Sequence, residues 1–120
     1  MNLTQKYISK EKGIIFVAEE KKEIIGCIIG SLSPFSLSEK IERYLKKRGY
    51  IRELIISRKA RGQGLGKKLL LAIENYFREQ KCQIIKLNCF GPDLKTHAFY
   101  THLGYKNHII EMEKKLPNLE

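Results

Sequence analysis

Short apolar segments recur along the chain and are separated by polar turns. Several of them are rich in Ile, Val and Phe, residues that favour the half-buried surface of a β-sheet. This pattern predicts strands over residues 13–19, 24–30, 50–57, 83–90 and 108–116. The polar residues between the first two strands predict a hairpin turn.

Other segments carry apolar residues at the spacing of one helix face. The clearest predicts a long helix over residues 66–80. A second helix is predicted over residues 38–49, with Gly49 as its C-cap. A third is predicted between Pro92 and Gly104, because proline opens turns and glycine commonly ends helices.

The length of 120 residues suits one domain. We therefore expect a single domain over residues 1–120, in which residues 1–12 form a short N-terminal helix or extension. Residues 3–10 within it are weakly helical. The hydrophobic fraction of 42% is ordinary. No apolar run approaches the roughly 20 residues needed to cross a bilayer, and we expect no membrane partner.

The cysteines suggest a reducing compartment. Cys27, Cys82 and Cys89 are three in number and show no C-x-x-C spacing, so reduced thiols are favoured over disulfides or a zinc site. The first residues contain no apolar core of a signal peptide. We expect a cytoplasmic protein that holds no metal.

The chain is strongly basic, with 23 Lys and Arg against 13 acids and a net charge of +10. Such a balance suits a nucleic-acid-binding module. However, the cations are spread along the chain, and only residues 46–48 and 58–68 form clusters. No aromatic RNA-binding motif or helix-turn-helix pattern accompanies them. We therefore expect no specific nucleic-acid partner.

The second basic cluster contains a glycine-rich turn, Arg61-Gly62-Gln63-Gly64-Leu65-Gly66-Lys67-Lys68, between a predicted strand and the long predicted helix. The start of a helix presents free backbone N–H groups and a partial positive charge. Glycines allow a ligand to approach the backbone closely. The turn is therefore a candidate phosphate site, although glycines also serve ordinary strand-to-helix connections.

Two common phosphate-binding patterns do not fit this turn. A P-loop requires Gly where the chain has Arg61, and Ser or Thr where it has Lys68. The dinucleotide pattern G-x-G-x-x-G fails whether it starts at Gly62 or at Gly64. The pattern that remains is Arg-x-x-Gly-x-Gly over residues 61–66.

This turn resembles the acyl-CoA-binding motif of the GNAT superfamily of N-acetyltransferases. The segment Phe99-Tyr100-Thr101-His102-Leu103-Gly104-Tyr105 is similar to the closing motif of that family. Both motifs occur in the family's order with a helix and a strand between them, and the resemblance covers residues 13–116. It implies an α/β (α+β) fold of the acyl-CoA N-acyltransferase type, with a mixed, largely antiparallel central sheet flanked by helices. Its two middle strands are expected to splay apart.

One departure from the family is large. Its members usually begin with a strand and one or two helices before the first hairpin, and we expect these elements to be lacking here. They commonly shape the acceptor pocket. Three arrangements are open: an exposed acceptor side, cover by the helix over residues 38–48, or completion by another subunit in a homodimer.

The resemblance implies that the chain transfers the acetyl group of acetyl-CoA, its cosubstrate, to a primary amine. Tyr100 matches the tyrosine that protonates the departing CoA thiolate, and a core tyrosine with a satisfied hydroxyl is the alternative. The pantetheine arm is expected along the central strand and the pyrophosphate on the turn. The expected cofactor-binding residues are Leu54, Ile55, Ile56, Arg61, Gly62, Gln63, Gly64, Leu65, Gly66 and Lys67.

The group that deprotonates the amine is harder to identify. Glu53 is the acid of the central strand and so the candidate catalytic residue, with a structural ion pair to Arg52 or another cation as the alternative. Strict alternation places Glu53 on one face with Ile51 and Ile55, and Arg52 on the other face. A strand bulge would change this assignment.

Two neighbours of the closing motif are weaker candidates. Asp93 stands where many family members carry an Asn that contacts the cofactor, and a carboxylate beside a polyanion is unfavourable. His97 matches a His of some relatives, but packing is the more common role for such a residue. Two other functions stay open: a catalytically silent acyl-CoA-binding regulator and a basic nucleic-acid-binding module. The acceptor could be a small amine, an amino acid, an aminoglycoside, a polyamine or a protein.

Overall fold

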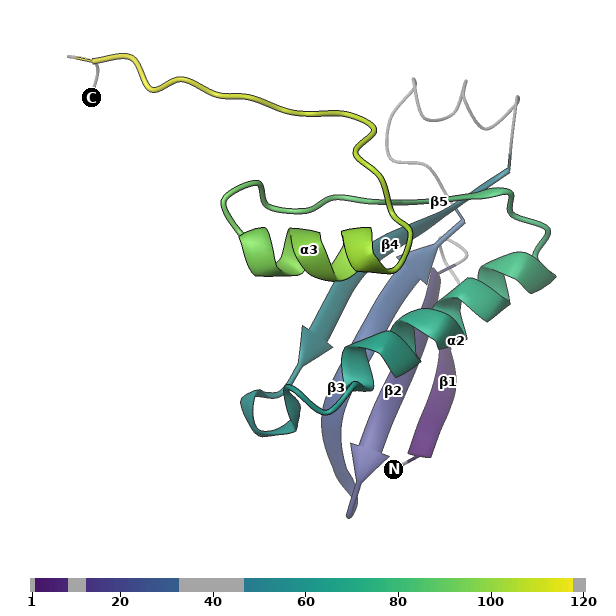
Figure 1. Cartoon of the computed structure of the whole chain (residues 1–120). Coiled ribbons are helices and arrows are strands. Elements are labelled where there is room, and N and C mark those ends of the chain that lie inside the picture. Colours follow the sequence, from purple (N-terminus) through teal and green to yellow (C-terminus); the bar gives the residue numbers. More distant parts are fainter. Residues whose placement is uncertain (1, 9–12, 33–46, 118–120) are drawn as a thin grey trace. The chain divides into compact units, whose positions relative to one another are not determined.

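The computed structural model describes residues 2–8, 13–32 and 47–117 (Figure 1). They belong to two compact units, Met1–Asn88 and Cys89–Glu120. The first unit contains a β-sheet and the helix α2, and the second contains the helix α3. Within the described residues, no helix has the length and apolar character needed to span a membrane.

The sheet of the first unit follows the order of the sequence. Its strands are β1 (Asn2–Ile8), β2 (Gly13–Glu20), β3 (Glu23–Ser31), β4 (Arg48–Ile56) and β5 (Ile84–Leu87), arranged β1-β2-β3-β4-β5. The first four pair antiparallel, and β5 pairs parallel to β4. The expected mixed, largely antiparallel sheet is therefore confirmed, with a shorter β5 than the pattern predicted.

The strand β1 corrects the expectation for the start of the chain. Residues 3–10 were expected to be weakly helical, but Asn2–Ile8 form a strand whose register runs from Asn2 opposite Glu19 to Ile8 opposite Gly13. A short segment of weak propensity takes the conformation that a neighbour stabilises, and the edge of β2 offers pairing along its whole length. A strand therefore does precede the hairpin.

Helix α2 (Leu65–Glu79) covers one face of this sheet (Figure 1). Its fully buried side chains include Leu69, Ile73 and Phe77. Gly49 of β4 lies directly beneath the helix, where a Cβ would come within 2.5 Å of the Phe77 ring. Glycine thus lets α2 lie close to the strands, and the core of the first unit forms in this contact.

The prediction of a helix over residues 38–49 is wrong at its C-terminal end. Arg48 and Gly49 belong to β4, so Gly49 is a packing position under α2 and not a helix C-cap. Residues 38–46 lie outside the described residues. Glycine in a strand often marks a place where another group lies close to the backbone. Gly49 beneath Phe77 is such a place.

The second unit contains α3 (Leu94–His102). The chain leaves the helix through Gly104, whose φ of 97° is in the left-handed region that favours glycine. The strand predicted over residues 108–116 is wrong, because these residues carry neither helix nor strand. Their apolar side chains, among them Ile110 and Met112, are exposed. A strand needs a neighbour to pair with, and no described residue pairs with this segment.

Candidate functional site

The site is built around the point where β4 separates from β5. The parallel pairing of these strands covers only four residues of each and ends with Ile51 opposite Leu87. β4 continues to Ile56. Among the described residues, the last part of β4 therefore has no paired strand on its β5 side. This is the expected splaying of the two middle strands, and it leaves an open edge of backbone.

A bulge in β4 lies at the same point. Ile29 of β3 faces Glu53, but the next residue, Gly30, faces Ile51, so Arg52 is an extra residue without an opposite partner. Residues directly opposite each other share a face. A Cβ at Gly30 would point at Ile73 and Phe77 of α2, so Ile51 is on the α2 face. Glu53, opposite Ile29, and Arg52, which contacts Ser31, are both on the other face. The assignment from strict alternation is wrong for Ile51 and Arg52, because one extra residue shifts the pattern.

The direction of the backbone groups on β4 follows from a single hydrogen bond. The N–H of Ser57 donates to the carbonyl of Ile25 on β3 at 2.8 Å. Peptide groups of successive residues in a strand point to opposite edges. The N–H groups of Leu54 and Ile56 therefore point to the open edge, and that of Ile55 points to β3. Of the three expected pantetheine contacts, two offer their backbone to the open edge.

A short turn joins the open edge to α2. It starts with a 3-10 turn, η2 (Arg58–Ala60), and passes through Gly62 and Gly64, each with a φ of 78°. A Cβ at either glycine would meet nothing within 4 Å. Glycine is thus favoured by the left-handed backbone and not by crowding. The space around both residues is open to a ligand.

The turn leaves a series of backbone donors at the start of α2. Within the part of the chain that the structure describes, no N–H group of residues 62–67 donates to a backbone carbonyl. The first that does is the N–H of Lys68, which donates to the carbonyl of Gly64 at 3.2 Å. The first turn of α2 contains no acid. Free donors, the helix dipole and the absence of a competing carboxylate together favour an anion.

Two of the cations around the turn stabilise its shape. Arg61 Nε donates to the carbonyl of Ile56 at 3.2 Å, which ties the turn to the end of β4. Lys59 Nζ lies 2.6 Å from Glu23 Oε2, an exposed ion pair with the first residue of β3. The other cations of the cluster are exposed and have no acidic partner among the described residues: Arg58, Lys67 and Lys68.

Glu53 is exposed on the face away from α2. No hydrogen bond or ion pair joins its carboxylate to another described residue, so the alternative of a structural ion pair with Arg52 is not seen there. Its charge acts on one neighbour: burial raises the pKa of the Cys27 thiol, and the negative charge of Glu53 raises it further. The carboxylate is therefore accessible to a ligand.

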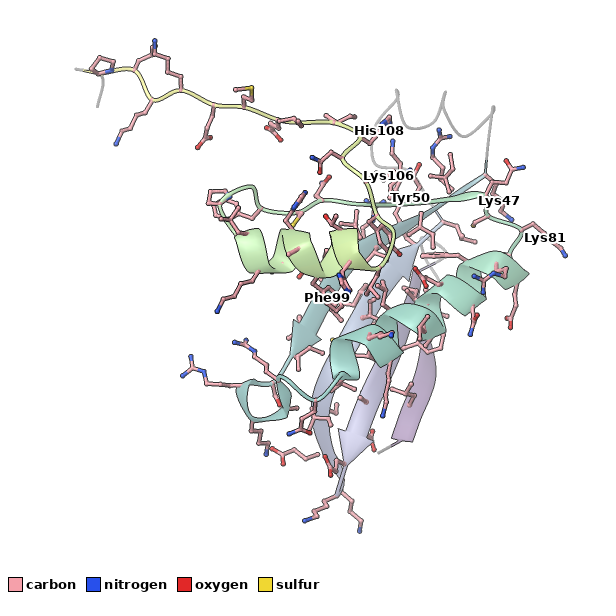
Figure 2. All side chains as sticks on the ribbon, in the orientation of Figure 1. Lys47, Tyr50, Lys81, Phe99, Lys106 and His108 are labelled. Carbon is pink, nitrogen blue, oxygen red and sulfur yellow. The ribbon has the colours of Figure 1, made fainter. Side chains whose placement is uncertain are left out.

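Arg52 is held by two side chains of the same face. Its Nε donates to Ser31 Oγ at 3.1 Å, and its guanidinium carbon lies 4.7 Å from the centre of the Tyr50 ring. Tyr50 lies on β4, where Figure 2 labels it. Alternation along β4 already puts Arg52 and Tyr50 on one face, but the sequence did not show that Ser31 of β3 lies opposite Tyr50 and within reach of Arg52.

Tyr100 lies on α3 in the second unit. Its ring contacts Phe99 and Tyr105 in edge-to-face arrangements, with centroid distances of 5.1 Å and 5.6 Å (Phe99 is labelled in Figure 2). Such pairs restrict the orientation of a ring. The other candidate site residues, Glu53 and those from Leu54 to Lys67, lie together in the first unit.

Asp93 has a structural role at the start of α3. Its carboxylate accepts the Thr96 hydroxyl at 2.6 Å and the Thr96 N–H at 3.1 Å. The hydroxyl and then the N–H of Thr96 hold the pKa of Asp93 below its ordinary value. His97 Nε2 lies 2.7 Å from Asn107 Oδ1 and joins the helix to the following segment. Among the described residues, no group of His, Cys, Asp or Glu could hold a metal ion.

Comparisons with known proteins agree with this geometry. The sequence model of the GNAT acetyltransferase family matches residues 1–105. The chain is 27% identical over 100 residues to YesJ, an uncharacterised N-acetyltransferase of Bacillus subtilis, covering 82% of this chain and 56% of that protein. It is also 27% identical over 101 residues to glucosamine 6-phosphate N-acetyltransferase of Arabidopsis thaliana, covering 84% of this chain and 64% of that protein.

Solved structures show the same fold. A candidate acetyl transferase of Pyrococcus furiosus superposes with a TM-score of 0.74 at 26% identity, covering 90% of this chain and 68% of that one. The chain spans between about half and two thirds of the curated relatives it matches, 56% of YesJ and 64% of the Arabidopsis enzyme. With a family match over most of its length and this fold, the chain belongs to the GNAT family of acetyltransferases.

Proposed function

We propose that the protein binds acetyl-CoA and transfers its acetyl group to a primary amine. The observation that supports this most is the continuity of two binding elements in the first unit. The open edge of β4 leads directly into the turn whose N–H groups favour an anion. An extended arm that ends in a pyrophosphate has the chemistry to bind both.

In this proposal each part of the cofactor has its own partners. The pyrophosphate accepts hydrogen bonds from the N–H groups of residues 62–67, with Lys67 adding positive charge. The pantetheine arm pairs with Leu54 and Ile56 as an added strand would. Arg61 occupies the carbonyl of Ile56 but leaves its N–H available. That N–H is the candidate donor to the thioester oxygen.

The reaction then needs one proton acceptor and one proton donor. The neutral amine attacks the thioester carbon, and the N–H of Ile56 stabilises the oxyanion of the tetrahedral intermediate. Glu53 takes the proton that the nitrogen loses, directly or through a water molecule. The carbon–sulfur bond breaks, and Tyr100 protonates the departing thiolate, since a phenol and a thiol have similar proton affinities.

The names of two similar proteins support an amine acceptor. One is a glucosamine 6-phosphate N-acetyltransferase and the other an aminoglycoside acetyltransferase, which shares the fold at 21% identity. Both names describe transfer to an amino sugar. A cytoplasmic location belongs to the same proposal and is supported by the three free thiols, Cys27, Cys82 and Cys89.

The cofactor site is tested by Gly64→Asp with Gly64→Asn as its matched control. Both replacements bring a side chain of similar size, and both tolerate a left-handed backbone better than most residues do. Only Asp adds negative charge beside the pyrophosphate. We expect Gly64→Asp to weaken acetyl-CoA binding by more than about tenfold, about 1.4 kcal/mol, in a calorimetric titration. Gly64→Asn should lose much less.

Equal affinity of the parent and Gly64→Asp would contradict this placement. Activity is tested separately by thiol release from acetyl-CoA with a panel of primary amines. Release that depends on the amine supports the transferase. Tight binding of acetyl-CoA without release for any amine would favour the silent acyl-CoA-binding regulator.

A further inference from the structure

Helix α2 covers one face of the open edge of β4. A Cβ at Gly26, which lies opposite Ile56, would be 3.1 Å from Ile56 Cδ1 and 3.1 Å from Leu65 Cδ2 of the helix. The side chain of Ile56 is therefore on the α2 side. Glu53 and Ile55 are on the other face, because side chains two residues apart in a strand share a face. An acceptor that meets a thioester at this edge therefore approaches from the face of Glu53 and Ile55.

Apolar side chains surround one carboxylate on that face. Ile55 has 53% of its surface exposed, and Glu53 is also exposed. Ile29 lies directly opposite Glu53 on β3, and Cys27 lies opposite Ile55, both of them half-buried. Burial, and then the charge of Glu53, raises the pKa of the Cys27 thiol, so this group stays neutral and weakly polar. We call the three uncharged side chains, Ile55, Cys27 and Ile29, the apolar strip.

The cation of this face lies on the other side of Glu53. Arg52 Nε donates to Ser31 Oγ at 3.1 Å, and its guanidinium carbon lies 4.7 Å from the centre of the Tyr50 ring. Ser31 is opposite Tyr50, on the side of Glu53 away from Ile55. The guanidinium is therefore directed away from the apolar strip. Among the described residues, no ion pair or hydrogen bond occupies the Glu53 carboxylate.

This arrangement is complementary to an amine with an apolar body. The carboxylate of Glu53 attracts a protonated amino group. The apolar strip beside it favours carbon atoms, because their contact removes apolar surface from water. Sites for small molecules commonly combine such a lining with a few placed polar groups. The hydroxyl groups of a sugar would lose their hydrogen bonds to water against the strip and gain none there.

We propose that Glu53 and the apolar strip form the acceptor subsite for a small primary amine with an apolar body, an aliphatic or arylalkyl amine. The amino group lies at Glu53, and the carbon chain lies along Ile55 and Cys27. This inference rests on the proposed acetyl transfer. It adds the class of acceptor, and Ile55 becomes a residue that determines specificity.

The parent protein is tested first with a matched pair of acceptors, hexylamine and aminoethoxyethanol. Their chains have the same length, but the second carries an ether oxygen and a hydroxyl in place of carbon. We expect kcat/KM to be higher for hexylamine by about tenfold or more, as contacts in an apolar site provide. The oxygen atoms make the second amine less basic and leave more of it neutral, which opposes the expected preference. Glucosamine, an amino sugar, should also be a poorer acceptor than hexylamine.

The variant Ile55→Thr tests the apolar strip. Threonine keeps the β-branched shape that suits a strand but replaces carbon by a hydroxyl. We expect KM for hexylamine to rise by about fivefold or more, because apolar contact is lost. KM for aminoethoxyethanol and the affinity for acetyl-CoA should change little. Ile24→Thr is the matched control, because Ile24 is a similarly exposed isoleucine of the sheet, at 57%, and lies opposite Glu19, away from the open edge. It should leave both acceptor KM values unchanged.

The outcomes separate the two ideas. Absence of acetyl transfer to every amine would overturn the proposed function, and this inference with it. Transfer by the parent to aminoethoxyethanol or glucosamine as efficiently as to hexylamine would overturn the inference alone, whether or not Ile55→Thr folds. The same conclusion follows if Ile55→Thr binds acetyl-CoA like the parent and changes KM equally for both members of the pair, or for neither.

Discussion

Among single residues, Tyr100 makes the sharpest distinction between an enzyme and a silent binder. Its ring is fixed by Phe99 and Tyr105, so removal of the hydroxyl should leave the packing intact. We expect Tyr100→Phe to lower kcat by roughly 10²-fold, as the loss of a general acid does. Acetyl-CoA affinity should stay within a few-fold, which calorimetry can check beside single-turnover kinetics.

Tyr105→Phe is the matched control for this variant. It removes a hydroxyl from the ring that packs against Tyr100 and should leave kcat near that of the parent. Parental turnover by Tyr100→Phe on a genuine acceptor would make Tyr100 a packing residue. The fall should occur mainly in kcat, because a general acid acts on the transition state.

The residue scale is also where prediction from sequence was least complete. The glycine turn and its cations follow from composition and order, and the structure places them at the start of a helix as expected. The hydrogen bond from Arg52 to Ser31 does not follow, because it depends on the register between β3 and β4, and the position of Arg52 and Glu53 on one face depends on one unpaired residue in β4. Nothing in the pattern of apolar and polar positions marks that bulge.

At the scale of elements, the contact between α2 and the sheet depends on glycine. A Cβ at Gly49 would lie 2.5 Å from Phe77 Cγ and Cδ1, and these atoms are at the base of a buried ring. We expect Gly49→Ala to lower the free energy of unfolding by about 1–3 kcal/mol, the usual cost of overpacking. Chemical denaturation of the two proteins measures this difference.

Gly91→Ala is the control for this substitution. A Cβ there would meet nothing within 4 Å, and the residue has no left-handed φ. Its replacement should be neutral or slightly stabilising, because alanine restricts the unfolded chain. The double variant Gly49→Ala with Phe77→Leu should recover part of the loss. A Gly49→Ala protein as stable as the parent would show that α2 can move away from β4 at little cost.

Elements were predicted well where the local pattern of apolar residues was strong. They were predicted poorly where the conformation depends on pairing with another strand. The long helix and the strands β2, β3 and β4 agree with the sequence to within a few residues. The predictions for the segments at the two ends of the chain were wrong in opposite ways. Asn2–Ile8 form a strand because the edge of β2 is available for pairing. Residues 108–116 form no strand, and no described residue pairs with them.

For the whole molecule, the order of the two motifs carried most of the information. Their sequence separation fits one helix and one strand, and this arrangement indicated the family that the comparisons show. The charge of +10 was less informative, because the same balance suits nucleic acid and a polyanionic cofactor. The separation of β4 from β5 was predicted from the resemblance alone, because it depends on pairing between strands that are far apart in the sequence.

The close approach of Gly49 to Phe77 gives the molecule an internal reporter. One α-proton of Gly49 points at the ring, and a proton held against the face of an aromatic ring resonates well upfield in an NMR spectrum. That resonance is present only while α2 rests on β4. The opposite end of the same helix carries the turn proposed for acetyl-CoA. Titration with the cofactor can therefore be followed at a single glycine signal. The signal reports whether binding at one end of α2 changes the packing of its other end against β4.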